Sequence, residues 1–279
     1  MNEKIDLLKD YLYNIPQITM SFIFGSYSKN QHTIDSDIDI AVYFKPKDNL
    51  IEWEETIIYP MEDEIWTNIE RILNIETDFI VLNRASSNLA LSIISDGVAL
   101  FIKDNAFYLR FYLLISSAAE YFRDFTKDFY LIKNRSLSLS EIDRDRLIRL
   151  TDFLETELND YPQFINISQK DYLSNSSTRR NTERWIENLI NSSIDIAKII
   201  LASEKQTLPQ TYRQIMEDLS LIKDFNPHTS KTLSKYAKLR NILAHDYIDT
   251  RFIQIRMFID EAESAYKDLL SFVKNLIKI

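Results

Sequence analysis

The sequence predicts an α+β protein, in which a small mixed β-sheet with helices is followed by an all-α helix bundle. Three observations predict this division. Short apolar runs bounded by turn residues, which are typical of strands, recur within the first 102 residues. From residue 140 on, no strand pattern occurs, and prolines separate stretches of helical spacing. Between these parts, Lys133–Ser140 has the composition of a linker, so we expect domains over residues 1–135 and 136–279.

The elements follow from the spacing of their apolar residues. Strands are expected where apolar residues run to a glycine, a proline or a turn: residues 18–24, 37–44, 76–82 and 98–102. Helices are expected in the first part over residues 3–13, 48–73 (one helix, or two broken at Pro60), 86–95 and 105–133. In the second part they are expected over residues 141–160, 168–174, 178–204, 210–222, 229–246 and 249–277.

Composition limits the location and the partners. The chain has 279 residues, of which 45% are hydrophobic and 27% charged, as in a globular protein. It has no cysteine, which excludes disulfides and thiolate zinc sites and suits the cytoplasmic location that we expect. The N-terminal residues resemble a helix start rather than a signal peptide. The longest apolar stretch, near Phe107–Ala119, contains Arg110 and is too short to span a bilayer, so we expect no membrane association.

Charge is divided unevenly between the two parts. Residues 1–135 hold 13 Lys and Arg against 21 Asp and Glu, whereas residues 136–279 hold 20 against 21. The net charge of −9 therefore lies almost wholly in the first part. We expect RNA, if it binds, to bind the second part through a local basic patch. We expect no DNA partner.

One motif combines a glycine at a strand end with paired carboxylates. Gly25 and Ser26 close the first strand, ten residues follow, and Asp37 and Asp39 open the second strand. Gly25 is one of only two glycines in the chain, and glycine lets a bound group come close to the backbone. Residues i and i+2 of a strand share a face, so Asp37 and Asp39 project together. Such a pair suits Mg²⁺, although a hairpin with an acidic edge would look similar.

Gly-Ser, ten residues and Asp-x-Asp resemble the signature of the polymerase-β-type nucleotidyltransferases in their minimal (MNT) form. The resemblance implies that Gly25 and Ser26 bind the phosphates of ATP, and that Asp37 and Asp39 bind Mg²⁺ and are catalytic. In that family a third carboxylate opens the adjacent strand, a place that Asp78 occupies here, although an aspartate at a strand start is often simply solvated.

The chain departs from the family pattern directly after Gly-Ser. Related proteins often have a basic residue and a glycine there, whereas this chain has Ser28, Lys29 and Asn30. Asparagine tolerates the left-handed conformation nearly as well as glycine, and Lys29 can supply the charge that binds nucleotide.

A second constellation lies at Arg240, Asn241, His245 and Tyr247. On an ideal helix Arg240 and His245 are about 140° apart, so a helix break or a two-fold dimer seam would be needed to bring them to one atom. Histidine can transfer a proton near neutral pH, and arginine can neutralise a phosphorane. This chemistry suits attack of a ribose 2′-hydroxyl on the next phosphate without a metal. A capped or solvated Arg–His pair is the simpler alternative.

Arg-x4-His-x-Tyr resembles the motif of the HEPN superfamily ribonucleases, and Arg179–Ala197 resembles the facing helix of the HepT-like branch. The resemblance implies that Arg240, Asn241 and His245 are catalytic on RNA. In related systems a HEPN toxin is restrained by a separate MNT antitoxin, which transfers AMP from ATP to the tyrosine of this motif. Tyr247 occupies that position, so the chain looks like a fused toxin–antitoxin that dimerises through its helical domain.

Two other classes of function stay open at this stage. In an antibiotic-type nucleotidyltransferase, the helical domain would only shape the acceptor site and dimerise, and Arg240 and His245 would have no role. In a non-catalytic binding module both sites would be relics, which the intact Asp37 and Asp39 disfavour.

Overall fold

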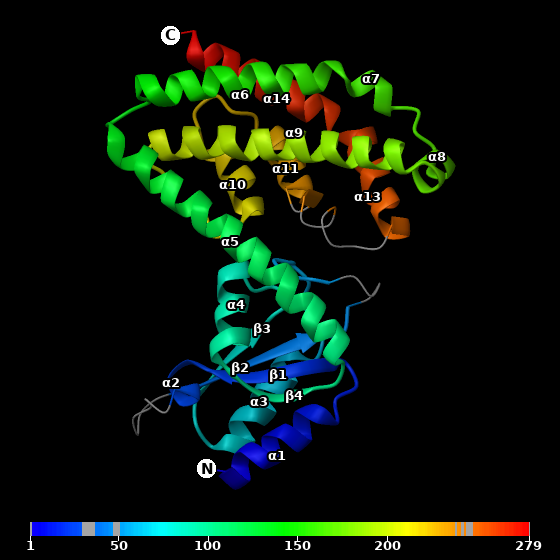
Figure 1. Ribbon diagram of the computed structural model, residues 1–279. Helices are drawn as coiled ribbons and strands as arrows, with labels where there is room; N and C mark the ends of the chain where they lie inside the picture. Colours follow the sequence, from blue (N-terminus) through cyan, green and yellow to red (C-terminus); the bar gives the residue numbers. More distant parts are fainter. Residues whose placement is uncertain are drawn as a thin grey trace. The chain divides into compact units, whose positions relative to one another are not determined.

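A computed structural model describes residues 2–29, 37–46, 51–237, 239–240, 243 and 248–278. The chain divides into two compact units, residues 1–122 and 123–279. The division falls within helix α5 (Asn105–Arg135), which continues from one unit into the other (Figure 1). The domain boundary expected after residue 135 coincides with the end of this helix and stays a prediction.

The first unit is built on a small mixed sheet, as the sequence predicts, with four strands in the order β3-β2-β1-β4. Strand β2 (Ile38–Phe44) pairs antiparallel with β1 (Ile18–Phe24) and parallel with β3 (Thr77–Val81). Strand β4 (Val98–Ile102) pairs antiparallel with β1. All four strands lie within one residue at each end of their predicted ranges. The short apolar runs therefore located the strands, because each packs at least one face in a core.

Helices cover both faces of the sheet (Figure 1). Helices α1 (Asn2–Tyr13) and α3 (Glu62–Leu73) pack on the face of β2 that carries Ile38, Ile40 and Val42. Helix α4 (Ser87–Asp96) and the first turns of α5 pack on the opposite face, which carries Ala41 and Tyr43. The alternation of β2 therefore puts Asp39 on the α4 side of the sheet, away from the Ile40 core.

The prediction of helix before Pro60 is wrong for residues 51–59, which form no helix. The backbone N–H groups of Glu54 and Glu55 donate to the carbonyls of Ala85 and Asn83 instead of to their own preceding turn. Glu52 is 9% exposed and accepts a hydrogen bond from Asn83 at 2.8 Å, which fixes this segment over the ends of β2 and β3. Tertiary hydrogen bonds thus outweigh a helical pattern of isoleucines.

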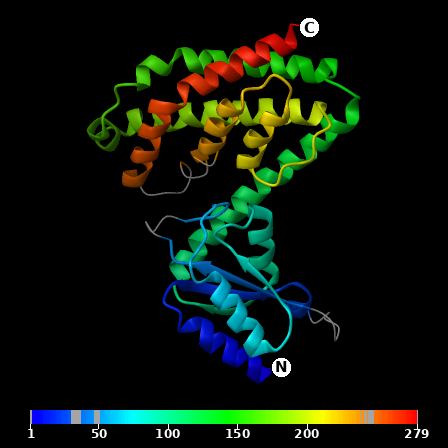
Figure 2. The same ribbon diagram turned by 180° about the vertical axis from the view of Figure 1, so that it is seen from behind.

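The second unit is a helix bundle (Figure 2). After α5 it contains α6 (Glu141–Asn159), α7 (Tyr161–Phe164), α8 (Gln169–Ser174), α9 (Ser176–Ser203), α10 (Tyr212–Asp218), the 3-10 turn η1 (Leu219–Leu221), α11 (Pro227–Tyr236), α13 (Ile248–Glu261) and α14 (Glu263–Ile277). Several of these helices begin at a Ser, Thr or Asn whose side chain accepts a backbone N–H, as at Ser140, Ser168, Asn175, Thr211 and Asn226. Within the described residues, no helix is both long and apolar enough to cross a membrane.

The single helix expected over residues 249–277 is two helices that meet at Ala262. No proline or glycine marks this break in the sequence. The hydroxyl of the buried Tyr161 donates to the carbonyls of Phe258 and Ile259, at 3.3 and 3.0 Å. A tyrosine from a distant helix thus satisfies backbone acceptors where the helix is interrupted.

Candidate functional site

The turn after β1 is shaped around a carboxylate. Gly25 has φ +66°, and a Cβ built on it would lie 1.9 Å from Oδ2 of Asp39. The Oγ of Ser28 donates to the carbonyl of Gly25 at 3.0 Å and closes the four-residue helix α2 (Gly25–Ser28). Gly25 is therefore required both by its left-handed backbone and by the space that Asp39 occupies.

The three predicted carboxylates lie on adjacent strand ends. Asp39 is directly opposite Asp78 in the parallel register of β2 and β3, and opposite Phe24 in β1. Burial raises the pKa of Asp39, and the negative charges of Asp78 and Asp37 raise it further. Asp39 is half-buried, whereas Asp37 and Asp78 are exposed. The structure thus brings together Gly25 and the three carboxylates of Asp37, Asp39 and Asp78.

These carboxylates fit a Mg²⁺ ion that takes its remaining ligands from the substrate. Among the residues that the structure describes, no three His, Cys, Asp or Glu side chains form a group that could hold a metal ion. Mg²⁺, however, usually binds one or two carboxylates and takes its other ligands from water and phosphate. The hard oxygens of Asp39 and its neighbours, and the mutual repulsion that a cation would relieve, match that requirement.

Lys29 lies directly after this turn, and its Nζ is 3.7 Å from Oδ2 of Asp96. Both side chains are more than half exposed, so the pair is weak. The next residue, Gly97, ends α4 against β1: a Cβ there would lie 2.4 Å from the carbonyl of Ile93 and 2.9 Å from that of Ile23. Both glycines of the chain thus lie where close packing forms this end of the sheet. Asn30 lies outside the described residues.

In the second unit, Arg240 is the one residue of the predicted Arg-x4-His-x-Tyr constellation within the described residues; Asn241, His245 and Tyr247 lie outside them. The Cζ of Arg240 is 5.4 Å from the ring centroid of Tyr212, the first residue of α10. Arg240 is half-buried, and its neighbour Leu239 is 2% exposed. The guanidinium therefore lies against an aromatic face at the edge of the helical core.

The two halves also match different known families. The family model described as "Polymerase beta, Nucleotidyltransferase" matches residues 6–106, and the one described as "Ribonuclease HepT-like" matches residues 154–276. The tRNA nuclease HepT of Aphanizomenon flos-aquae is 31% identical to this chain over 109 residues, which are 39% of the chain and 74% of that relative. The chain belongs to the HepT-like family.

Before its HepT-like domain, the chain carries a polymerase-β-type nucleotidyltransferase domain. The protein adenylyltransferase MntA of Shewanella oneidensis is 32% identical over 97 residues, 34% of this chain and 60% of that protein. The chain thus spans less than two thirds of this relative's length. A crystal structure described as a toxin–antitoxin with AMP-PNP is 25% identical, covers 44% of this chain and 89% of its own, and has a TM-score of 0.35, too low to support a shared arrangement.

The second unit contains a half-buried ion network that the sequence did not reveal. Nζ of Lys198, a residue 6% exposed, lies 2.8 Å from Asp128 Oδ2 and 2.8 Å from Asp195 Oδ1. Arg146 adds two hydrogen bonds to Asp128, at 3.1 and 2.7 Å. Burial acts to raise the pKa of Asp128, but the hydrogen bonds from Arg146 and Lys198 lower it to about 2. Asp195 and Lys198 are three residues apart, but Asp128 and Arg146 lie far from them in sequence, so spacing gave no signal of the network.

A second cluster joins the start of α13 to α8 and α9. Glu183 accepts a hydrogen bond from the hydroxyl of Tyr172 and pairs with Nη1 of Arg251 at 3.2 Å. Glu183 thus pairs with Arg251, and Asp195 pairs with Lys198. Arg251 and Glu183 are 68 residues apart in the chain, so sequence spacing gave no signal of this pair.

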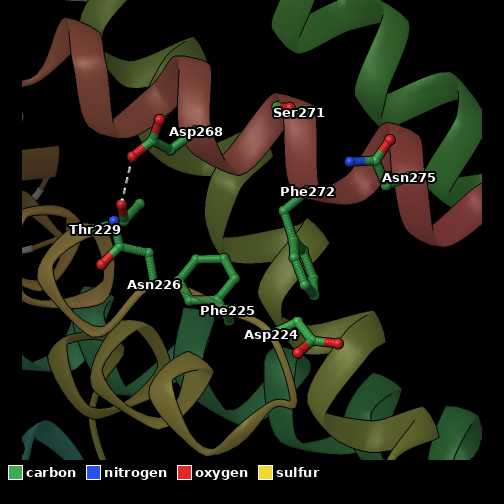
Figure 3. Close-up of a pocket in the computed structure, with 8 residues that line it drawn as sticks. All are labelled: Asp224, Phe225, Asn226, Thr229, Asp268, Ser271, Phe272 and Asn275. Carbon is green, nitrogen blue, oxygen red and sulfur yellow. Dashed lines mark hydrogen bonds between the residues drawn. The ribbon is translucent and has the colours of Figure 1, made fainter.

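A cavity of about 300 Å³ opens between the segment before α11 and helix α14 (Figure 3). Its apolar side is formed by Phe225 and Phe272, which pack edge-to-face at 4.9 Å. Its polar side includes Asp224 and Asp268, and Asp268 accepts a hydrogen bond from Thr229 at 2.8 Å. The eight residues that line it include no Lys, Arg or His, so the cavity is unsuited to phosphate.

Proposed function

We propose that this chain is a fused HEPN/MNT toxin–antitoxin, in which the first domain transfers AMP from ATP to Tyr247 and thereby restrains a ribonuclease in the second. The observation that carries this proposal is the register of β2 and β3, in which Asp39 lies opposite Asp78 and beside Gly25. That arrangement belongs to a nucleotidyltransferase domain joined to a HepT-like domain in one chain.

The residues of the first domain have separate roles in the proposed transfer. Gly25 and Ser26 hold the terminal phosphates of ATP against the backbone of the turn, and Lys29 adds a positive charge beside them. Asp37, Asp39 and Asp78 would hold Mg²⁺, which when bound neutralises the phosphates and polarises the α-phosphorus. The phenol oxygen of Tyr247 forms a bond to that phosphorus, the bond to the β-phosphate oxygen breaks, and pyrophosphate leaves. Asp78 accepts the phenol proton.

The second domain would cleave RNA without a metal. His245 exchanges the proton of the attacking ribose 2′-hydroxyl, Arg240 neutralises the phosphorane, and Asn241 orients the phosphate. AMP on Tyr247 would add a negative phosphodiester in the same motif as Arg240, where it competes with RNA for the cation. We further propose a cytoplasmic homodimer joined through the helical domains, because an ideal helix separates Arg240 and His245 by about 140°.

The experiment is intact-mass analysis of the purified chain before and after incubation with ATP and Mg²⁺. We expect the mass of one or more AMP units to appear in the parent chain and to be absent from Asp39→Asn and from Tyr247→Phe. Tyr130→Phe is the matched control, because Tyr130 is also a tyrosine of the helical unit and is 46% exposed. Loss of tRNA cleavage on incubation with ATP should accompany the mass gain. No added AMP, or AMP still added to Tyr247→Phe, would count against the proposal.

A further inference from the structure

The ring of Tyr212 is fixed in place before any RNA binds. Tyr212 is 5% exposed and begins α10, where the side chain of Thr211 caps the helix by accepting the N–H of Gln214 at 3.1 Å. Phe125 of α5 packs edge-to-face on Tyr212, with ring centroids 5.8 Å apart at 89°. A ring held by a capped helix and by a second aromatic side chain has little freedom to turn.

The support behind Tyr212 extends to the ion network. Nζ of Lys198 lies 5.2 Å from the ring centroid of Phe125, and Lys198 is itself held by Asp128 and Asp195. Phe125 is 5% exposed and is therefore buried. Tyr212 thus rests on a contiguous set of contacts from α5 and α9.

Arg240 lies over the face of Tyr212, with its Cζ 5.4 Å from the ring centroid. The π electrons of an aromatic face attract the charge of a guanidinium that lies over it. When the guanidinium stacks on the ring, its N–H groups point outward and can bind another group. Arginine has a long side chain with many rotamers, and the aromatic face reduces the number of them that are populated. The contact therefore orients the guanidinium without neutralising its positive charge, so the charge can act on phosphate.

We propose that Tyr212 is a positioning residue for Arg240, whose guanidinium it holds ready for the phosphate at the RNA bond that is cleaved. This inference rests on the proposed ribonuclease function and names a determinant of that site outside the Arg-x4-His-x-Tyr motif. The contact that carries this proposal is the one between Arg240 and the ring face of Tyr212. A purely structural role in the core would instead require only an apolar side chain of similar volume.

The test compares cleavage of bulk tRNA by full-length variants, all carrying Asp39→Asn so that AMP transfer cannot mask the ribonuclease. Tyr212→Leu should lower kcat by about 10- to 100-fold, the loss that follows when a reacting group is misplaced by about 1 Å, while KM stays within about threefold. Tyr212→Phe should keep most of the kcat, because it keeps the ring. Phe225→Leu is the matched control: it removes a ring that is 6% exposed and packs edge-to-face on Phe272, without contacting Arg240 in any interaction that we observe.

Each outcome separates the possibilities. Urea unfolding of the same variants should give similar losses of stability for Tyr212→Leu and Phe225→Leu, with only the first losing kcat. If Tyr212→Leu keeps the kcat of the parent chain, or if Tyr212→Phe loses as much kcat as Tyr212→Leu, Tyr212 does not position Arg240 through its ring. If the parent chain itself does not cleave tRNA although Tyr247 is unmodified, the proposed ribonuclease function fails, and this inference fails with it.

Discussion

Replacing Gly25 by alanine should damage the proposed AMP transfer far more than it damages folding. The added Cβ would lie 1.9 Å from Oδ2 of Asp39, which is the end of a side chain that can rotate away. The left-handed φ of +66° adds about 1 kcal/mol of backbone strain, so the free energy of unfolding should fall by about 1–2 kcal/mol. The rotated carboxylate, however, would be displaced by at least about 1 Å, which costs about 100-fold in rate.

The assay is the initial rate of AMP incorporation by intact mass, with the free energy of unfolding measured by urea on the same samples. Gly97→Ala is the matched control, because its Cβ would meet the carbonyls of Ile93 and Ile23 rather than a carboxylate. Backbone oxygens cannot rotate away, so this variant should lose about 1–3 kcal/mol of stability and keep its rate per folded molecule within about threefold. A Gly25→Ala chain that transfers AMP at the parental rate would refute the reasoning.

Three further predictions concern charge. The pKa of Asp39 is raised above 3.8, so in metal-free buffer protonation of Asp39 stabilises the fold at low pH. This stabilisation is lost as the pH rises from 3.8 through the raised pKa. In Asp39→Asn, the free energy of unfolding by urea should depend less on pH in this range. The pKa of Asp128 is lowered to about 2, so its contribution, about 1–2 kcal/mol after allowance for partial exposure, is present at pH 7 and lost as pH falls from about 4 to about 2. Asp128→Asn should therefore destabilise the chain at pH 7 but hardly at pH 2, and equal losses at both would contradict this. Asp96→Asn should release Lys29 and tighten ATP binding up to about fivefold by calorimetry, and weaker binding would exclude the assigned role of Lys29.

The sheet and the carboxylates were predictable because both depend on local alternation. In β2 the period of two that buries Ile38, Ile40 and Val42 also sets Asp39 on the opposite face. The position of Asp78 beside Asp39 followed from a family resemblance, and the parallel register of β2 and β3 confirms that adjacency. The metal and catalytic roles of these residues stay predictions.

What the sequence could not reveal depends on contacts between distant segments. Residues 51–59 have isoleucines at helical spacing, but their backbone bonds to the segment after β3. At the break at Ala262, the hydroxyl of Tyr161, about a hundred residues earlier in the chain, donates to the carbonyl of Ile259. The contact of Tyr212 with Arg240 likewise joins two helices whose proximity no spacing rule gives.

Helix α5 makes it difficult to express the two units as separate chains. Phe111 and Ile115 are fully buried in the sheet-bearing unit, and Phe129 is fully buried in the helical unit, all on one uninterrupted helix. A cut between residues 122 and 123 would sever that helix and leave unsatisfied backbone groups at both new ends. Because the two domains lie on one chain, every molecule carries one nucleotidyltransferase-type domain for each HepT-like domain, and the ratio of the two cannot vary with expression.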